Sequence, residues 1–391
     1  MKFFSKFLFL TVFGSLALVS CDDDENTTPE PEPALDRSEV VSTYSSMVFA
    51  GYQDAMIDAQ NLEQAINTFV ADPTESNFEM TKEMWLVSRE SYGPTEAFRF
   101  ANGPIDAEDG PEGLLNAWPL DEVYVDYVED APNAGIINDL ETYPTLDKAL
   151  LESLNEAGGE ANISIGYHAI EFLLWGQDLT DPSEMLPGQR KYTDFVSGEN
   201  GTASNQDRRR QYLVLCADLL TDHLQLMIDQ WTVGGPYRST IDNANVEEVL
   251  SNMLTAIATL SKSELGGERM FVAYDNQDQE DEHSCFSDNT DRDIRLNLDG
   301  IANVYRGSYK NISGVSLEDL IKEADPSLGD EVSAALVAAE TAVYATANPF
   351  DFAIFDGAER PKVLAAVTAL QTLGDKLVQG AAALGLSITT D

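Results

Sequence analysis

The sequence predicts an all-α fold of packed helical bundles, and three observations support this prediction. Apolar residues recur at spacings of three and four over long stretches, which is typical of amphipathic helices. The breaks between these stretches contain Gly, Pro or Asp, residues that commonly end helices. No stretch shows the persuasive alternation of apolar and polar residues that marks a half-buried strand. The length of 391 residues allows one large core or two sub-domains.

The N-terminal part of the chain is expected to form helices over residues 38–70, 77–92, 146–155 and 163–174. Asn162 or Ser164 is expected to cap the last of these helices, because short polar side chains accept hydrogen bonds from a first helical turn. Residues 101–130 are rich in Gly, Pro and Asp and predict a long ordered connection with one short helix. Connections of this length in compact domains commonly line a functional site.

The C-terminal part is expected to form helices over residues 207–231, 246–265, 293–305, 330–344 and 361–384. The apolar stripes of 207–231 and 361–384 are the clearest of the chain. A polar loop at 181–204 precedes these helices, and a second concentration of polar residues lies at 266–291.

The N-terminus predicts an exported, lipid-anchored protein. Residues 1–20 combine Lys2 and Lys6 with an apolar run too short to span a bilayer comfortably, as a secretory signal peptide does. The following Leu18-Val19-Ser20-Cys21 resembles a bacterial lipobox, so we expect acyl chains on Cys21. The alternative is an ordinary signal peptide with an incidental cysteine. Residues 21–37 are acidic and Pro-rich and predict an extended tether. The expected location is the bacterial outer membrane, at the cell surface or on the periplasmic face.

The charge of the chain restricts its partners. Removal of residues 1–20 takes away two lysines and no acid, which changes the formal charge from −45 to −47. Such a surface repels nucleic acid and favours cations or basic partners. Apart from Cys21, only Cys216 and Cys285 remain, and they allow at most one disulfide.

The first candidate site is the pair His168 and Glu171. The chain has only three histidines, and this one lies in the apolar helical run 163–174. Residues three apart share a helix face, so imidazole and carboxylate could hold one metal ion, such as iron, zinc, manganese or copper. The alternative is a buried ion pair between two helices. The histidine at 223 is expected to be a plain surface or core-edge residue.

Two further polar blocks could complete the site. The block at 267–290 contains Arg269, Glu282, His283, Ser287 and Asp288. Its alternative interpretation is a solvated acidic loop, although the apolar residues in its middle indicate partial burial.

The other block, at 89–99, mixes aromatic with charged residues and could supply carboxylate or supporting contacts. It contains Arg89, Tyr92, Glu96 and Arg99. Ordinary salt bridges at helix ends are the alternative.

The sequence Gly166-Tyr167-His168-Ala169-Ile170-Glu171 matches the Gly-x-His-x-x-Glu signature of the imelysin-like family. Both polar blocks also stand in the order seen in that family, and the resemblance covers roughly residues 38–385. It implies two helical halves, approximately 38–205 and 206–385, each similar to a four-helix bundle, with the signature helix near their junction. It also implies a bacterial envelope protein tied to iron handling, and some members of the family are classed as metallopeptidases.

The leading hypothesis is a lipid-anchored envelope protein that binds a metal, iron in preference to zinc, and serves iron uptake or homeostasis with partner proteins. Its expected ligands come from a set of six residues: His168, Glu171, Glu96, Glu282, His283 and Asp288. The expected supporting residues are Gly166, Tyr92, Arg89, Arg99, Arg269 and Ser287.

Two alternatives come from other classes of protein. One is a zinc metallopeptidase of the imelysin type, but the signature lacks the second His and the adjacent Glu of the His-Glu-x-x-His helix. The other is a protein that binds a small organic ligand or a haem-like compound without a free metal ion.

Overall fold

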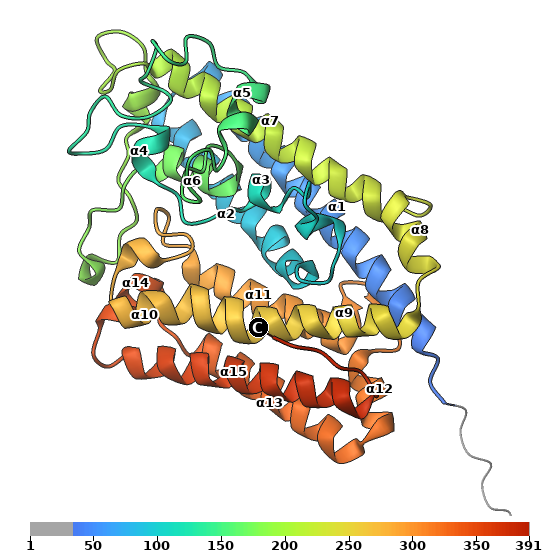
Figure 1. Ribbon diagram of the computed structural model, residues 1–391. Helices are drawn as coiled ribbons and strands as arrows, with labels where there is room; N and C mark the ends of the chain where they lie inside the picture. The colour runs from blue at the N-terminus through green and yellow to red at the C-terminus, as the bar shows by residue number, and fades with distance from the viewer. Residues whose placement is uncertain (1–33, 391) are drawn as a thin grey trace, which may run out of the picture. The chain divides into compact units, whose positions relative to one another are not determined.

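In the computed structural model, residues 34–390 are described, and they confirm an all-α fold (Figure 1). The predicted signal peptide, the predicted acyl site Cys21 and the tether up to residue 33 lie outside the described residues. None of the helices between 34 and 390 is long and apolar enough to cross a membrane. Within the same range, Cys216 and Cys285 are both buried and free.

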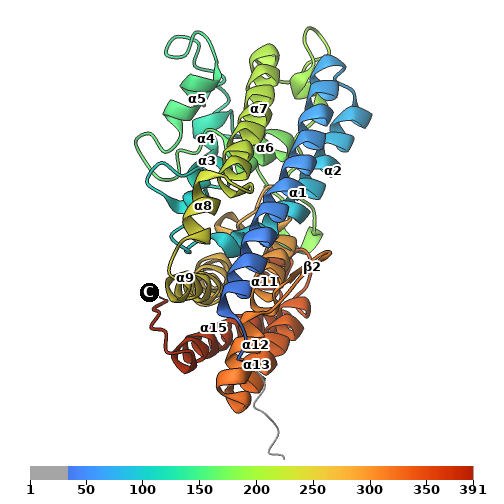
Figure 2. The same cartoon turned by 90° about the vertical axis from the view of Figure 1, so that its right-hand side faces the viewer.

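The N-terminal helices pack around α1, which contacts both α2 and α7, while α6 contacts α2 and α7. Figures 1 and 2 show α1 and α7 running side by side. The main elements are α1 (Arg37–Ala71), α2 (Glu75–Tyr92), the 3-10 helix η1 (Gly93–Phe98), α6 (Gly166–Trp175) and α7 (Gln206–Trp231). The short elements are η2 (Pro104–Asp106), α3 (Glu112–Leu115), α4 (Glu122–Val125), α5 (Lys148–Leu154), η3 (Pro182–Glu184), η4 (Tyr192–Phe195) and α8 (Pro236–Asp242).

The C-terminal helices pack around α15, which contacts α9, the π-helix η5 and α13. A two-stranded antiparallel hairpin pairs Ser308 with Ser313 and Tyr309 with Ile312. The helices are α9 (Val246–Thr259), η5 (Leu260–Phe271), α10 (Val272–Asn276), η6 (Gln279–Asp281), α11 (Thr290–Arg306), α12 (Leu317–Ala324), α13 (Pro326–Tyr344), α14 (Phe350–Phe355) and α15 (Arg360–Ala383), and the strands are β1 (Ser308–Tyr309) and β2 (Ile312–Ser313).

The two groups of helices meet where α11 packs against η1 and the end of α2. Because α7 packs against α1 and α6, it belongs with the N-terminal group. Helix α8 contacts α7 and α1, so the C-terminal group begins with α9. The two halves implied by the resemblance, 38–205 and 206–385, stay a prediction.

The structure differs from the expected elements at several places. The connection 101–130 contains two short α-helices, α3 and α4, where one was expected. Neither Asn162 nor Ser164 caps α6, since its N-cap residue is Ile165 and the Ser164 hydroxyl donates instead to the carbonyl of Leu151. The helix expected to end at residue 265 continues through η5 and α10, because buried side chains such as Met270 extend its apolar face past the glycines. The short helices α8, α12 and α14 contain too few turns to produce a visible period.

Candidate metal centre

Gly166 begins α6 with a φ of +88°, a conformation that favours glycine. A Cβ atom at this position would lie 2.7 Å from the carbonyl oxygen of Leu115, so the close approach of α6 to α3 also requires glycine. Every residue of α6 is buried. The signature glycine therefore fixes where the next two signature residues are presented.

His168 and Glu171 face each other on α6, with 2.8 Å between His168 Nδ1 and Glu171 Oε2. The other carboxylate oxygen of Glu171 accepts hydrogen bonds from the backbone N–H of Ser287 at 3.0 Å and from its hydroxyl at 2.6 Å. Both oxygens of Glu171 are thus engaged. The remaining ring nitrogen, His168 Nε2, is buried and has no hydrogen-bond partner among residues 34–390.

His283 has a similar arrangement, with 2.8 Å between its Nδ1 and Asp293 Oδ2. The Ser284 hydroxyl donates to the same oxygen at 2.5 Å. Arg89 donates to Asp293 Oδ1 from Nε at 3.2 Å and from Nη2 at 3.1 Å. The Asp293 carboxylate therefore holds the ring of His283 and neutralises a buried guanidinium at once.

The two imidazole rings lie against each other, with 4.7 Å between their centroids and an interplanar angle of 77°. Each ring uses Nδ1 toward a carboxylate, which leaves Nε2 for another partner. The Nε2 atom of His283 has only a marginal contact, 3.5 Å from Asn116 Nδ2. A carboxylate that fixes one imidazole nitrogen while the other binds a metal is a common arrangement in metalloproteins.

Both histidines are held in the neutral form. Burial, followed by repulsion from Arg89, lowers the pKa of His168 to about 3. Burial, followed by repulsion from Arg269, lowers the pKa of His283 to about 3 as well. Burial raises the pKa of Glu171 to about 8, despite its hydrogen bonds from Ser287. Neutral imidazole is the form that ligates metals, so neither histidine has to lose a charge-carrying proton at pH 7.

Glu96 lies beside this pair and is held by arginines. Its Oε2 accepts from Arg269 Nη2 at 2.6 Å and from Arg99 Nη1 at 3.3 Å. Its Oε1 is 3.4 Å from Asn116 Nδ2, the amide that also contacts His283. Burial opposes its ionisation, but attraction to Arg269 and Arg99 outweighs burial and lowers the pKa of Glu96 to about 2.

Three other predicted site residues, Tyr92, Glu282 and Asp288, make no hydrogen bond to the histidines among the described residues. Tyr92 packs its ring 4.8 Å from that of Tyr167, the residue before His168, and it supports the site without a polar contact to the histidines. Glu282 and Asp288 are not hydrogen-bonded to His168, Glu171 or His283 within the described part of the chain. The prediction that these two acids complete the same site thus gains no support from the hydrogen bonds.

A family model described as imelysin (peptidase M75) matches residues 48–377. The chain belongs to the imelysin family. It is 26% identical over 342 residues to iron-regulated protein A of Synechococcus elongatus, which covers 85% of this chain and 82% of that protein. A crystal structure assigned to an iron-regulated protein A precursor of Parabacteroides distasonis superimposes with a TM-score of 0.69 at 18% identity, covering 90% of this chain and 97% of that one. The crystal structure supports the fold.

In this imelysin-family chain, sequence reasoning missed Asp293 and Asn116, which contact the histidine site directly. Asp293 is the first residue of the helix expected over 293–305, and nothing in its neighbours in the sequence distinguishes it. Asn116 lies in the connection that was expected to line a site, and that expectation is the only signal that pointed to it. Trp118 in the same connection donates to the carbonyl of Glu282 at 2.7 Å.

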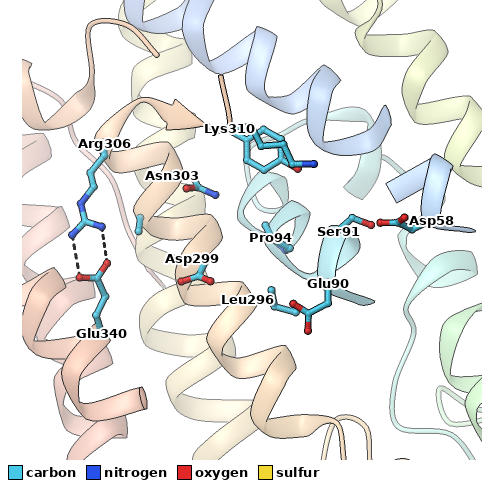
Figure 3. A pocket seen from close by; sticks show the side chains of 12 residues that line it. Asp58, Glu90, Ser91, Pro94, Leu296, Asp299, Asn303, Arg306, Lys310 and Glu340 are labelled. Carbon is cyan, nitrogen blue, oxygen red and sulfur yellow. Dashed lines mark hydrogen bonds and ion pairs between the residues drawn. The ribbon is translucent and has the colours of Figure 1, made fainter. Parts of the chain in front are cut away.

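A surface pocket of about 460 Å³ lies beside η1 and α11, but none of the predicted site residues lines it (Figure 3). Its charged groups are largely satisfied by neighbours. Arg306 pairs with Glu340 at 2.6 Å, as Figure 3 shows, and Lys310 pairs with Asp54 at 2.7 Å. Both cations of the pocket are therefore already paired with acids, and the buried histidines remain the better candidate.

Proposed function

We propose that this chain binds an iron ion through the Nε2 atoms of His168 and His283. The observation that carries the proposal is the buried Nε2 of His168, which has no partner among the described residues. A buried polar atom without a partner costs about 1–3 kcal/mol, so its persistence is best explained by a ligand. The adjacent imidazole offers a second nitrogen of the same kind.

The donor set fits a transition metal. Imidazole nitrogen suits iron, zinc, copper and nickel, and iron is favoured here because the relative in Synechococcus elongatus is named an iron-regulated protein. Between residues 34 and 390, no three His, Cys, Asp or Glu side chains already converge as a metal site. A third ligand would therefore come from solvent, or from Glu96 after it turns away from Arg269.

Glu171 and Asp293 have positioning roles in this proposal. Each accepts a hydrogen bond from one Nδ1–H, which keeps the lone pair of the opposite Nε2 free for the metal. That role differs from direct ligation by Glu171, which the helical spacing suggested and which stays a prediction. Glu282 and Asp288 are not part of this ligand set.

The alternatives have less support. A zinc peptidase needs a carboxylate free to activate water, but both oxygens of Glu171 are engaged and Glu96 is paired with Arg269. An organic ligand or a haem-like compound needs a cavity, but His168 and His283 are each only 1% exposed.

The test is titration calorimetry with ferrous and ferric iron, together with elemental analysis, on the wild type and on His168→Ala. The matched control is His223→Ala, because His223 is also buried but pairs with Glu152 at 2.9 Å, away from the site. We expect His168→Ala to lose binding while His223→Ala retains it. Absence of iron binding in the wild type, or equal binding in both variants, would refute the proposal.

We also infer that the protein is exported and held at the outer membrane by acyl chains on Cys21, where it would pass iron to an uptake partner. This inference rests on the signal-like residues 1–20 and the lipobox-like segment before Cys21. Mass spectrometry of the mature N-terminus tests it, and an unmodified Cys21 or cleavage elsewhere would contradict it. Protease treatment of intact cells distinguishes the surface from the periplasmic face.

A further inference from the structure

Four carboxylates from three distant segments lie near one another beside the proposed iron site. Asp178 follows α6, Glu282 and Asp288 lie between η6 and α11, and Asp351 is in the first turn of α14. Five of their oxygens are buried and have no hydrogen-bond partner within the described residues: both Oε atoms of Glu282 and the Oδ2 atoms of Asp178, Asp288 and Asp351.

Glu282 is the decisive member of this acidic cluster. It is 1% exposed, and neither of its carboxylate oxygens is hydrogen-bonded to any residue between 34 and 390. The Thr290 side chain lies close by, but neither carboxylate oxygen of Glu282 has a hydrogen-bond partner among the described residues. A buried carboxylate in such surroundings must be paired, protonated or bound to a cation.

The segments that carry the cluster are joined by direct contacts. Gln279 donates from Nε2 to the carbonyl of Asp178 at 2.8 Å, which ties the loop after α6 to η6. Helix α14 packs against both η3 and α10. The charges of Asp351, Asp288 and Asp178 all act on the carboxylate of Glu282, which therefore lies near the other three.

We propose that Glu282, Asp288, Asp351 and Asp178 bind a hard divalent cation, calcium, at a site separate from the two histidines. Calcium takes six to eight oxygen ligands, with carboxylates binding through one or two oxygens in a flexible geometry. The cluster offers carboxylate oxygen and no imidazole, which distinguishes its chemistry from that of His168 and His283. Since these side chains do not already converge as a finished metal site, the carboxylates turn toward the cation on binding.

Calcium bound by the acidic cluster would affect the iron site through the peptide bond that joins Ser287 to Asp288. Asp288 directly follows Ser287, whose N–H and hydroxyl both donate to Glu171. A cation held by Asp288 fixes that segment and therefore fixes Glu171 against His168. Calcium would thus organise the site without contacting the iron.

The experiment measures thermal unfolding and titration calorimetry of the mature chain with CaCl₂ and with EDTA. The variants are Glu282→Gln and, as a matched control, Glu268→Gln, which alters an exposed acid on η5. We expect calcium to raise the thermal midpoint of the wild type and of Glu268→Gln by a few degrees. Glu282→Gln should weaken calcium binding at least tenfold and remove most of that rise.

Thermal unfolding in EDTA distinguishes a loss of calcium binding from a folding defect. Without calcium, Glu282→Gln should be as stable as the wild type or more stable, because the change removes one of four repelling carboxylates. His168→Ala should keep the calcium response, so failure of the iron proposal would leave this one intact. A wild type that does not respond to calcium would overturn the proposal and indicate that the acids are simply protonated. A calcium response that survives in Glu282→Gln would also overturn it, because calcium would then bind elsewhere on the chain.

Discussion

Glu171→Gln is the sharpest test of the positioning role that we assign to Glu171. The amide oxygen of Gln can still accept the two hydrogen bonds from Ser287, which places the amide nitrogen against His168 Nδ1. That nitrogen can only donate, so Nδ1 must accept and the ring proton moves to Nε2. The substitution therefore blocks the atom that is proposed to bind iron without removing the imidazole.

The expected magnitude follows from the contacts. Loss of a carboxylate that orients a histidine ligand typically lowers metal affinity 10–100-fold, which corresponds to about 1.4–2.7 kcal/mol. Stability should change little, because the amide oxygen of the variant keeps the hydrogen bonds from Ser287.

The assay is competition for ferrous iron against a chromophoric chelator at pH 7, with thermal unfolding measured on the same samples. Ser287→Ala is the matched control, because it removes a hydrogen bond to Glu171 and leaves the His168 tautomer free. We expect a few-fold loss of affinity at most in the control. A folded Glu171→Gln protein that binds iron as tightly as the wild type would refute the reasoning.

Two further predictions concern stability. Arg269 and Arg99 outweigh burial and lower the pKa of Glu96 from 4.5 to about 2. The ionised form of Glu96 therefore contributes about 3 kcal/mol to the free energy of unfolding above pH 4.5, and this contribution is lost as the pH falls toward 2. The gap in thermal midpoint between Glu96→Gln and the wild type should therefore shrink from pH 6 to pH 3, and a constant gap would contradict this. Gly166→Ala should lose roughly 2–5 kcal/mol in urea unfolding, since strain adds to a clash with a carbonyl of α3. Gly158→Ala, at the same φ of +88° but without that clash, should lose clearly less, and equal losses would argue against the clash.

Much of the fold follows from local periodicity. The stripes that predict α7 and α15 end within one residue of the observed helices, because long amphipathic faces are buried against neighbours over many turns. The end of α9 did not follow, since Gly266 and Gly267 suggested a break where the chain continues as a π-helix. Packing against α15 determines that continuation, and no local pattern reveals it.

The candidate site was predictable only in part. The spacing of His168 and Glu171 places both on one helix face, and the structure has them in direct contact. The roles of Glu282 and His283 were harder to predict, because these neighbours in the sequence have different surroundings. His283 contacts Asp293, whereas the carboxylate of Glu282 has no hydrogen-bond partner among the described residues. Asp293 reaches His283 only through the packing of α11, which the sequence of α11 alone does not disclose.

The burial of the two imidazoles has a kinetic consequence. Because His168 and His283 are each only 1% exposed, the proposed iron ion would reach their Nε2 atoms only if the surrounding segments moved apart. The observed rate of loading would then level off at high iron concentration, at the rate of that opening. Release would be slow for the same reason, so a partner that moves the segment between η6 and α11 away from α6 would control delivery better than one that only competes for the metal.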